Sequence, residues 1–169
     1  YVPRPYKSRI DRRFDYGLIR LARAAPSTVR AMTVVSPSTP QLRDIRQRHL
    51  LHISGYPGDK PRGSQWHHAE RLDGKTDAQL LYSIDTCPGH SGAPIWIENW
   101  NGRPVAVIGI HTSGPPAHPR GPWGCRAGVP MAPAGMFNRG VRLTPRLLQE
   151  FSALGRGQVP ASMVRLVPS

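Results

Sequence analysis

The sequence predicts an all-β protein, built on a Greek-key β-barrel and followed by one C-terminal α-helix. A chain of 169 residues has the length of one ordinary domain. Its 19 prolines and 17 glycines divide it into short segments and disfavour long helices. Several of these segments are apolar or β-branched and are bounded by turn residues, a pattern typical of a barrel or sandwich.

The predicted strands are all short. The first follows a basic, polar lead-in, and the second is rich in β-branched residues. The last two form a hairpin across the turn "NWNGRP", because Asn and Gly favour tight turns between strands. In chain order, strands are predicted at 14–21, 31–36, 50–55, 65–72, 78–85, 93–98 and 105–111.

The C-terminal third predicts a long loop, a helix and a tail. Residues 114–135 are mostly Gly, Pro and Ala, and ordered loops of that length are usually functional. Thr144 is suited to cap a helix whose first turn contains Pro145. The apolar face of this helix would consist of Leu147, Leu148, Phe151 and Leu154. The last fifteen residues are expected to form an extended tail.

The chain is strongly basic, with a formal net charge of +13. Three of its 23 basic residues are lysines and the others are arginines. The arginines are scattered and the aromatic residues are not interleaved with them, which disfavours a nucleic-acid stacking platform. We expect a solvated basic surface that would steer acidic substrates toward a site. No apolar run is long enough for a membrane helix, and no apolar signal segment opens the sequence, so a mature form that has lost one is expected.

The stretch "DTCPGHSGAP" (85–94) has the composition of a nucleophile loop. A serine hydroxyl is a weak nucleophile until a base removes its proton, and the oxyanion that forms next needs backbone N–H donors. Gly89 would let the chain turn so that its own N–H and that of Ser91 point the same way. Gly92 would leave space after the nucleophile. The pattern is short, and by itself a Gly-x-Ser-Gly turn is more often an ordinary turn.

Four segments in this order resemble the chymotrypsin-like serine proteases, and among them the bacterial glutamyl endopeptidases. The nucleophile loop is one of them. "FDYGLIRL" resembles the segment that carries the acid of the catalytic triad, and "VAVIGIHTSG" resembles the strand that lines the specificity pocket. "ISGYPGDKPRGSQW" resembles a segment of the glutamyl-endopeptidase branch. The resemblance spans roughly residues 10–155.

This resemblance implies a chymotrypsin-like Greek-key β-barrel, mainly the second barrel of a two-barrel protease. Residues 1–30 would be a lead-in and acid-bearing strand of the first barrel or inter-barrel region. Residues 31–143 would form the second barrel, and residues 144–169 the helix and tail. The implied activity is that of a serine endopeptidase, with Ser91 as nucleophile and Asp15 orienting a histidine. The amides of Gly89 and Ser91 would form the oxyanion hole.

The specificity suggested by the resemblance is for acidic side chains. Thr86 and His111 match the pair that holds a substrate carboxylate in glutamyl endopeptidases, and both side chains can donate hydrogen bonds to an anion. His111 has the alternative of an ordinary core-facing strand histidine. Asp85, however, stands where trypsin-like enzymes carry the carboxylate that selects Arg or Lys, and it would repel a substrate glutamate unless it turns away. Cleavage after Glu, or less often Asp, is favoured over cleavage after basic residues.

The two cysteines have a predicted role that also comes from the resemblance. Cys87 and Cys125 match a bridge that ties the nucleophile loop to the far wall of the pocket. Such a bridge would contribute about 4 kcal/mol on the chain-entropy model. Two reduced thiols are the alternative. His90, in the position before the nucleophile, is expected to be an exposed loop histidine, and it argues against activation by a new N-terminus pairing with an aspartate there.

The catalytic base is missing from the expected place. In the family the histidine precedes the acid, but no histidine precedes Asp15. All seven histidines follow it: His49, His52, His67, His68, His90, His111 and His118. Three explanations are open: an N-terminal protease chain that carries the histidine and stays associated as a heterodimer, a truncated fragment, or a pseudo-enzyme. The associated chain is the preferred partner.

The remaining expectations are a protein or peptide substrate, no cofactor, no metal and a secreted, periplasmic or extracellular location. Two cysteines lack the ligand set of a structural zinc site. Neither nucleic acid nor a membrane is an expected partner. The alternatives are a non-catalytic protein of the same fold, which binds a protein or polyanion through its basic surface, and a nucleic-acid binder in which the serine motif is incidental.

Overall fold

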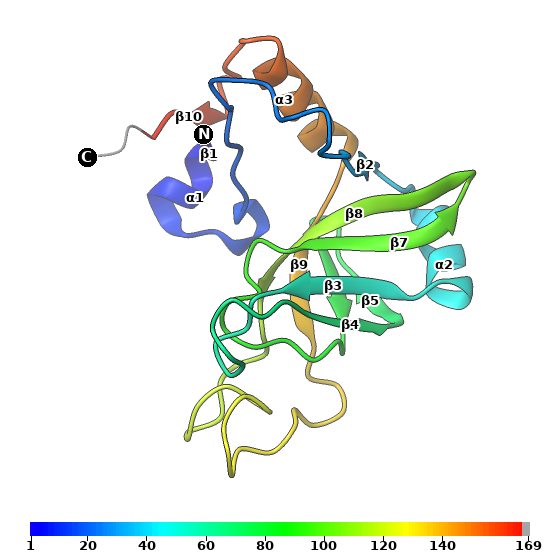
Figure 1. Ribbon diagram of the computed structural model, residues 1–169, viewed down its shortest axis with the longest axis vertical. Helices are drawn as coiled ribbons and strands as arrows, with labels where there is room; N and C mark the ends of the chain where they lie inside the picture. Colours follow the sequence, from blue (N-terminus) through cyan, green and yellow to red (C-terminus); the bar gives the residue numbers. More distant parts are fainter. Residues whose placement is uncertain (167–169) are drawn as a thin grey trace.

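A computed structural model describes residues 1–166 and contains one large, mainly antiparallel sheet (Figure 1). Within these residues the sheet has eight strands. Seven follow the order β4-β3-β7-β8-β9-β6-β5, and β2 pairs with β8 in parallel. The strands are β2 (Thr33–Val34), β3 (Leu51–Gly55), β4 (Trp66–Glu70), β5 (Leu72–Lys75), β6 (Gln79–Tyr82), β7 (Pro94–Trp100), β8 (Arg103–Ser113) and β9 (Asn138–Arg142).

The order of the strands requires the sheet to curl. Strands β4 and β5 lie at opposite ends of the hydrogen-bonded order, yet only Arg71 separates them in the chain. One residue cannot span a flat sheet, so the two ends must approach each other in space. This strand order confirms the prediction of a mainly antiparallel, barrel-like sheet.

The core lies inside the curl and follows the alternation of the strands. Successive side chains of a strand point to opposite faces. In β3 the inward residues Leu51 and Ile53 are almost fully buried while His52 faces outward, and in β7 Ile95 and Ile97 are fully buried. Gly109 on β8 and Gly140 on β9 leave the space that the Ile95 side chain occupies. This packing makes the sheet a rigid base for the loops at its end.

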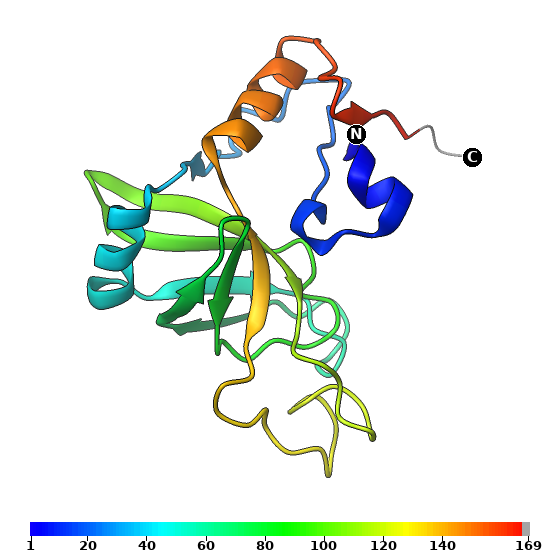
Figure 2. The same ribbon diagram turned by 180° about the vertical axis from the view of Figure 1, so that it is seen from behind.

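The predicted C-terminal helix is present as α3 (Pro145–Gly155). The side chain of Thr144 accepts a hydrogen bond from the Leu147 amide at 3.3 Å, which is a helix N-cap. Leu147 and Leu154 are buried. The predicted loop 114–135 contains turns and one isolated bridge but neither a helix nor a strand. It extends from the end of the sheet opposite to α3, as the front and back views both show (Figures 1 and 2).

The strand predicted at 14–21 is absent, and that prediction is wrong. The N-terminal segment instead forms β1 (Val2–Pro3), helix α1 (Arg4–Arg9) and the 3-10 turn η1 (Arg12–Phe14), and then continues without regular structure to β2. Residues 14–21 form no strand in the described part of the chain, and their pairing is limited to Leu18, which exchanges two backbone hydrogen bonds of 2.9 Å with Tyr1. Ile19 is 90% exposed and Leu21 63% exposed, so the apolar residues that suggested a strand have no core to enter.

Helix α2 and strand β9 were not expected from the sequence either. Helix α2 (Thr39–Arg48) begins with a capping box in which Ser38 and Gln41 bond each other's backbone amides, and its buried face is Leu42 and Ile45. Strand β9 lies between the predicted loop and the predicted helix, where no strand was predicted. The single strand predicted at 65–72 is two, β4 and the start of β5.

The predicted tail is only partly extended. It includes β10 (Met163–Val164), which pairs with β1, and its last positions, 167–169, lie outside the described residues. None of the helices in the described part of the chain combines the length and apolarity needed to cross a membrane.

Candidate active site

The nucleophile loop connects β6 to β7 and is fixed to the neighbouring strand β8. The Gly92 amide donates to the His111 carbonyl at 2.8 Å, and the His111 amide donates to the Ala93 carbonyl at 2.9 Å. Gly92 has a φ of +87°, a left-handed conformation that favours glycine. The Ser91 side chain is exposed, and its Oγ lies 3.4 Å from the Thr112 carbonyl. The hydroxyl is therefore presented to solvent from a backbone held by the sheet.

The backbone amides of Gly89 and of Ser91 itself are free of hydrogen bonds within the described residues. Neither the Gly89 nor the Ser91 N–H donates a hydrogen bond within residues 1–166, whereas the His90 amide between them donates to the Cys87 carbonyl at 3.1 Å. Gly89 has a φ of +109°, which a side chain would strain. Unpaired N–H groups beside a serine are the donors that a developing oxyanion requires.

A cavity of about 580 Å³ opens beside the serine. Its walls come from the end of β6, the nucleophile loop, the end of β8 and the loop 114–135. Thr86, Ser91 and His111 all line it, so the structure brings these predicted residues together. The polar side chains in its lining are Ser83, Asp85, Thr86, Ser91, His111, Ser113 and Asn138.

His111 is a buried, neutral donor or acceptor at this cavity. Its Nδ1 lies 2.7 Å from the Tyr82 hydroxyl. Burial, and to a lesser extent the neighbouring His90, lower the pKa of His111 to about 4, so the imidazole is uncharged near neutral pH. Burial also raises the pKa of Tyr82, which keeps its proton. When the Tyr82 O–H donates to Nδ1, the His111 Nε2 carries the ring proton.

Asp85 lies between two cavities. Its exposed side chain lines the large cavity and also a second one of about 230 Å³ on the other side of the nucleophile loop. Its backbone amide donates to His68 Nδ1 at 2.9 Å. The carboxylate is thus not turned fully away from the large cavity, and its negative charge remains next to any anion bound there.

The predicted disulfide is present and joins Cys87 to Cys125. It links the nucleophile loop to the loop 114–135, whose residues Trp123 and Met131 line the large cavity. His90, expected to be exposed, is buried at 6% exposure, and that expectation is wrong. Its Nδ1 lies 3.1 Å from both the amide nitrogen and the carbonyl oxygen of Cys87, and the ring fills the space beside Gly55.

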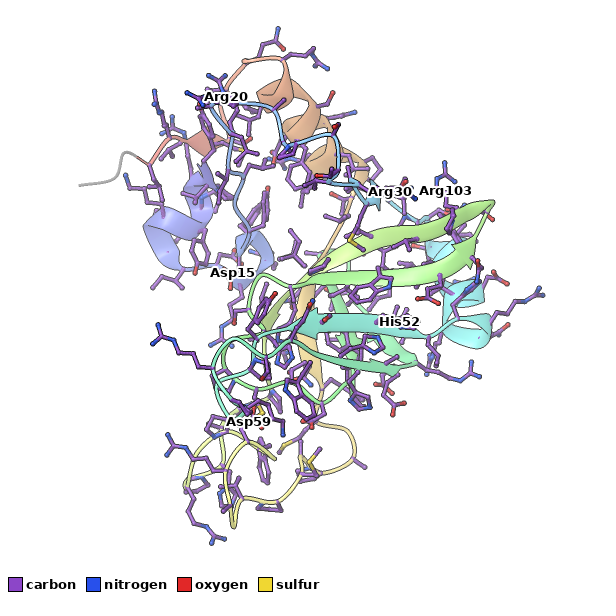
Figure 3. The ribbon with its side chains drawn as sticks, in the orientation of Figure 1. Asp15, Arg20, Arg30, His52, Asp59 and Arg103 are labelled. Atoms are coloured by element: carbon purple, nitrogen blue, oxygen red, sulfur yellow. A yellow bond between two sulfur atoms is a disulfide. The ribbon has the colours of Figure 1, made fainter. Side chains whose placement is uncertain are left out.

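Asp15 lies at the end of η1, outside the lining of the cavity (Figure 3). Its carboxylate is beside the Tyr6 hydroxyl, and its negative charge raises the pKa of Tyr6. The turn η1 contacts β9, and Thr112, the residue next to Ser91 Oγ, donates its hydroxyl to the carbonyl of Arg139 on β9. The turn that ends at Asp15 thus contacts β9, whereas Ser91 lies beside Thr112 of the neighbouring strand β8. Within residues 1–166, no histidine side chain is hydrogen-bonded to either Asp15 or Ser91.

Sequence reasoning missed three polar residues of this region. Ser113 and Asn138 line the cavity, and the Ser113 Oγ and Asn138 Oδ1 are buried without a hydrogen-bond partner among the described residues. A buried polar atom without a partner costs free energy. Ser113 stands two residues after His111 on β8, which was the available signal. Asn138 and Tyr82 reach the site because their strands pair, and no local pattern in the sequence reveals that pairing.

Comparisons with known proteins find similarity to glutamyl endopeptidases in sequence and in fold. The chain is 31% identical over 117 residues to a glutamyl endopeptidase of Bacillus licheniformis, a match that covers 68% of this chain and 35% of that protein. It is 35% identical over 82 residues to a glutamyl endopeptidase of Staphylococcus epidermidis. A solved structure of a Glu endopeptidase in complex with MPD superposes with a TM-score of 0.65 at 23% identity, over 94% of this chain and 62% of that chain.

The chain is a homologue of the glutamyl endopeptidases. It spans about a third of the length of the Bacillus relative that it matches. No family profile matches the chain. The likeness to the solved Glu endopeptidase extends over nearly the whole chain and supports the fold: a mainly antiparallel, barrel-like sheet followed by a C-terminal helix.

Proposed function

We propose that this glutamyl endopeptidase homologue is the nucleophile-bearing part of a serine endopeptidase that cleaves after Glu, or less often Asp. The observation that carries the proposal is the coincidence, on one rigid loop, of an exposed Ser91 hydroxyl and two unpaired amides beside a cavity with hydrogen-bond donors. Each feature alone is common, but acyl transfer requires all three together. The sequence relatives support the same chemistry.

In this mechanism Ser91 Oγ attacks the scissile carbonyl while a histidine removes its proton. The N–H groups of Gly89 and Ser91 stabilise the tetrahedral oxyanion. The histidine then protonates the leaving amine, and water hydrolyses the acyl-enzyme by the same steps in reverse. Asp15 orients the histidine and stabilises its charged form.

The acidic side chain of the substrate enters the large cavity. Thr86 and His111 donate hydrogen bonds to its carboxylate. A neutral His111 acts here as an N–H dipole and not as a counter-charge, because its pKa is lowered to about 4. The negative charge of Asp85 at the rim weakens binding of a carboxylate. The strength of the preference for Glu therefore depends on the balance between Asp85 and the hydrogen-bond donors.

We propose that an associated N-terminal chain supplies the histidine. The supporting observation is that the Bacillus relative extends far beyond the matched region, which covers 35% of its length. The segment 19–34 offers apolar side chains for such a partner to cover: Ile19, Leu21, Val29, Met32 and Val34 are each at least 40% exposed. This chain is then mainly the second of two barrels. The disulfide Cys87–Cys125 suits a secreted or extracellular protein.

Labelling with a serine-directed fluorophosphonate tests the proposal. In protein isolated with its companions, we expect one adduct per chain, located on Ser91, together with cleavage of peptides after Glu. Ser91→Ala should abolish both, and Ser27→Ala in the exposed N-terminal segment should change neither. Cleavage that survives Ser91→Ala would refute the assigned nucleophile.

A second candidate function is non-catalytic binding of a polyanion through the basic surface. The observation that favours it is the net charge of +13, to which Arg20, Arg30 and Arg103 contribute on the side of the molecule away from the Asp59 loop (Figure 3). This function predicts binding to heparin that weakens steeply with salt, no adduct on Ser91, and no effect of Ser91→Ala.

A further inference from the structure

Residues 55–58, Gly-Tyr-Pro-Gly, run alongside residues 88–90 of the nucleophile loop. They begin at the end of β3 and belong to the segment "ISGYPGDKPRGSQW", to which the proposed mechanism assigns no role. The Gly58 amide donates a hydrogen bond of 2.7 Å to the Pro88 carbonyl. Gly55 packs against the His90 ring, and the Tyr56 carbonyl faces the Cα of Gly89.

The fit between the two segments depends on three glycines. A Cβ at Gly55 would lie 2.8 Å from Cδ2 of His90, and one at Gly58 would lie 3.3 Å from the Pro88 oxygen. At Gly89 a Cβ would overlap the Tyr56 carbonyl. At Gly89 the two backbones leave no room for a side chain, and at Gly58 a methyl group would have to displace the Pro88 carbonyl by a few tenths of an ångström. The contact is therefore a specific feature of this sequence and not an incidental loop crossing.

The hydrogen bond at Pro88 sets the direction of the Gly89 amide. In a trans peptide the C=O and the following N–H point in opposite directions, and no cis peptide occurs among the described residues. With the Pro88 carbonyl directed at Gly58, the Gly89 N–H points away from residues 55–58 and stays unpaired. A rotation of this peptide by about half a turn would break the 2.7 Å bond and replace the N–H donor by a carbonyl, which repels an oxyanion.

We propose that residues 55–58 position the oxyanion hole by holding the Pro88–Gly89 peptide in its donating orientation. Gly58 is a positioning residue that acts through its backbone N–H. Both segments also line the second cavity of about 230 Å³, so other side chains do not fill all the space around them. The Gly58–Pro88 bond is the hydrogen bond that joins the two segments. The proposal rests on the proposed function, since a hole for an oxyanion has a use only in acyl transfer.

The hydrogen bond itself is measured first, without reference to activity. In the deuterated, ¹⁵N,¹³C-labelled chain, a long-range HNCO experiment should detect a through-hydrogen-bond coupling between Gly58 N and Pro88 C′. Gly58→Ala, whose methyl group would press on the Pro88 oxygen, should remove this coupling and shift the Gly89 amide resonance. Arg62→Ala, an exposed change in the same loop, should leave both unchanged. Absence of the coupling in the unmodified chain would overturn the proposal, even if Gly58→Ala failed to fold.

The consequence for catalysis is measured on the assembled protease. Loss of one oxyanion donor typically lowers kcat by a factor of about 100 or more, so a loosened donor in Gly58→Ala should lower kcat at least about tenfold. KM should stay within about twofold, because the oxyanion exists only in the transition state. Arg62→Ala should match the unmodified enzyme. An unchanged kcat in Gly58→Ala would contradict the positioning role, whereas an unmodified protein without any activity would contradict the proposed function and leave the NMR result to stand on its own.

Discussion

The curled sheet and the N-terminal segment differ in how completely each is packed. The sheet has a continuous core in which Ile95, Ile97 and Leu80 are fully buried. Residues 19–34 are all exposed, Ile19 to 90%. The first region is folded by its own hydrophobic core, whereas the second exposes the apolar surface that usually marks an interface.

The same difference divides the candidate active site. Ser91, the two free amides and the cavity all belong to the sheet and the loops that it fixes. Asp15 belongs to the N-terminal segment, and Tyr16 beside it is the residue that docks this segment: its hydroxyl donates to Glu150 of α3 at 2.7 Å. The nucleophile side of the candidate site is therefore positioned by the sheet, and the proposed acid by the docked N-terminal segment.

The disulfide should be the largest single contribution to the stability of the sheet and the loops that it fixes. Replacing both Cys87 and Cys125 by Ser should lower the free energy of unfolding by about 4 kcal/mol, because the unfolded chain gains the entropy of an open 38-residue loop. Urea unfolding followed by circular dichroism measures the difference. Reduction of the unmodified protein should give the same value, and a change below about 1 kcal/mol would contradict the account.

A pair of isoleucine substitutions tests the contrast in packing directly. Ile95→Ala empties a fully buried position between Gly109 and Gly140 and should cost about 3 kcal/mol. Ile19→Ala, on the exposed segment, should change the free energy of unfolding by less than about 0.5 kcal/mol. Urea unfolding of the isolated chain measures both. Similar costs at the two sites would show that the N-terminal segment shares the core.

The pH dependence of stability should report the burial of His111. Its folded pKa of about 4 lies below the ordinary histidine value, so the unfolded state binds more protons between these two values. Stability should therefore be complete above the ordinary value and fall as the pH drops toward 4, by about 2 kcal/mol. His111→Gln, which keeps an acceptor for Tyr82 but does not titrate, should remove this component from urea unfolding measured at pH 7 and pH 4.5. An equal pH dependence of stability in both proteins would contradict the assignment to His111.

The smallest predicted effect concerns the rim of the cavity. Asp85→Asn removes a negative charge next to the proposed carboxylate site and should lower KM for glutamyl peptides about threefold in the assembled enzyme, since the side chain is exposed and screened. Asp59→Asn is the matched control, because Asp59 lines only the second cavity and pairs with Lys60 at 3.1 Å. A higher KM for glutamyl peptides in Asp85→Asn would indicate that Asp85 does not face the bound side chain.

Most of the sheet and its helix could be predicted from the sequence, because short local patterns determine the structure there. Alternating apolar residues marked β3 and β7, the Asn-Gly turn marked the hairpin, and Thr144 with Pro145 marked the start of α3. The cysteine pairing came from the resemblance, and the structure contains it. Thr86, Ser91 and His111 were also named from the sequence, and the structure places all three around one cavity.

The errors came from regions where local pattern and tertiary contact disagree. The segment 14–21 has strand-like composition but pairs with Tyr1 only through Leu18, and hydrogen-bonded ladders depend on a partner that no local pattern reveals. Helix α2 was hidden because basic residues surround the two positions, Leu42 and Ile45, that carry its buried face. His90 looks exposed as a polar residue in a loop, yet its burial is caused by Gly55 of a distant strand.

In the proposed function, Ser91 acquires its reactivity from an imidazole that an associated N-terminal chain supplies. Intact-mass spectrometry under denaturing conditions, on protein isolated natively and then treated with a fluorophosphonate, tests this claim most directly. We expect a single adduct on this chain at Ser91, a second polypeptide that contains a histidine-bearing segment, and no rapid labelling of this chain alone. Rapid labelling and peptide cleavage by the isolated chain, or no adduct on Ser91 in the native material, would contradict it.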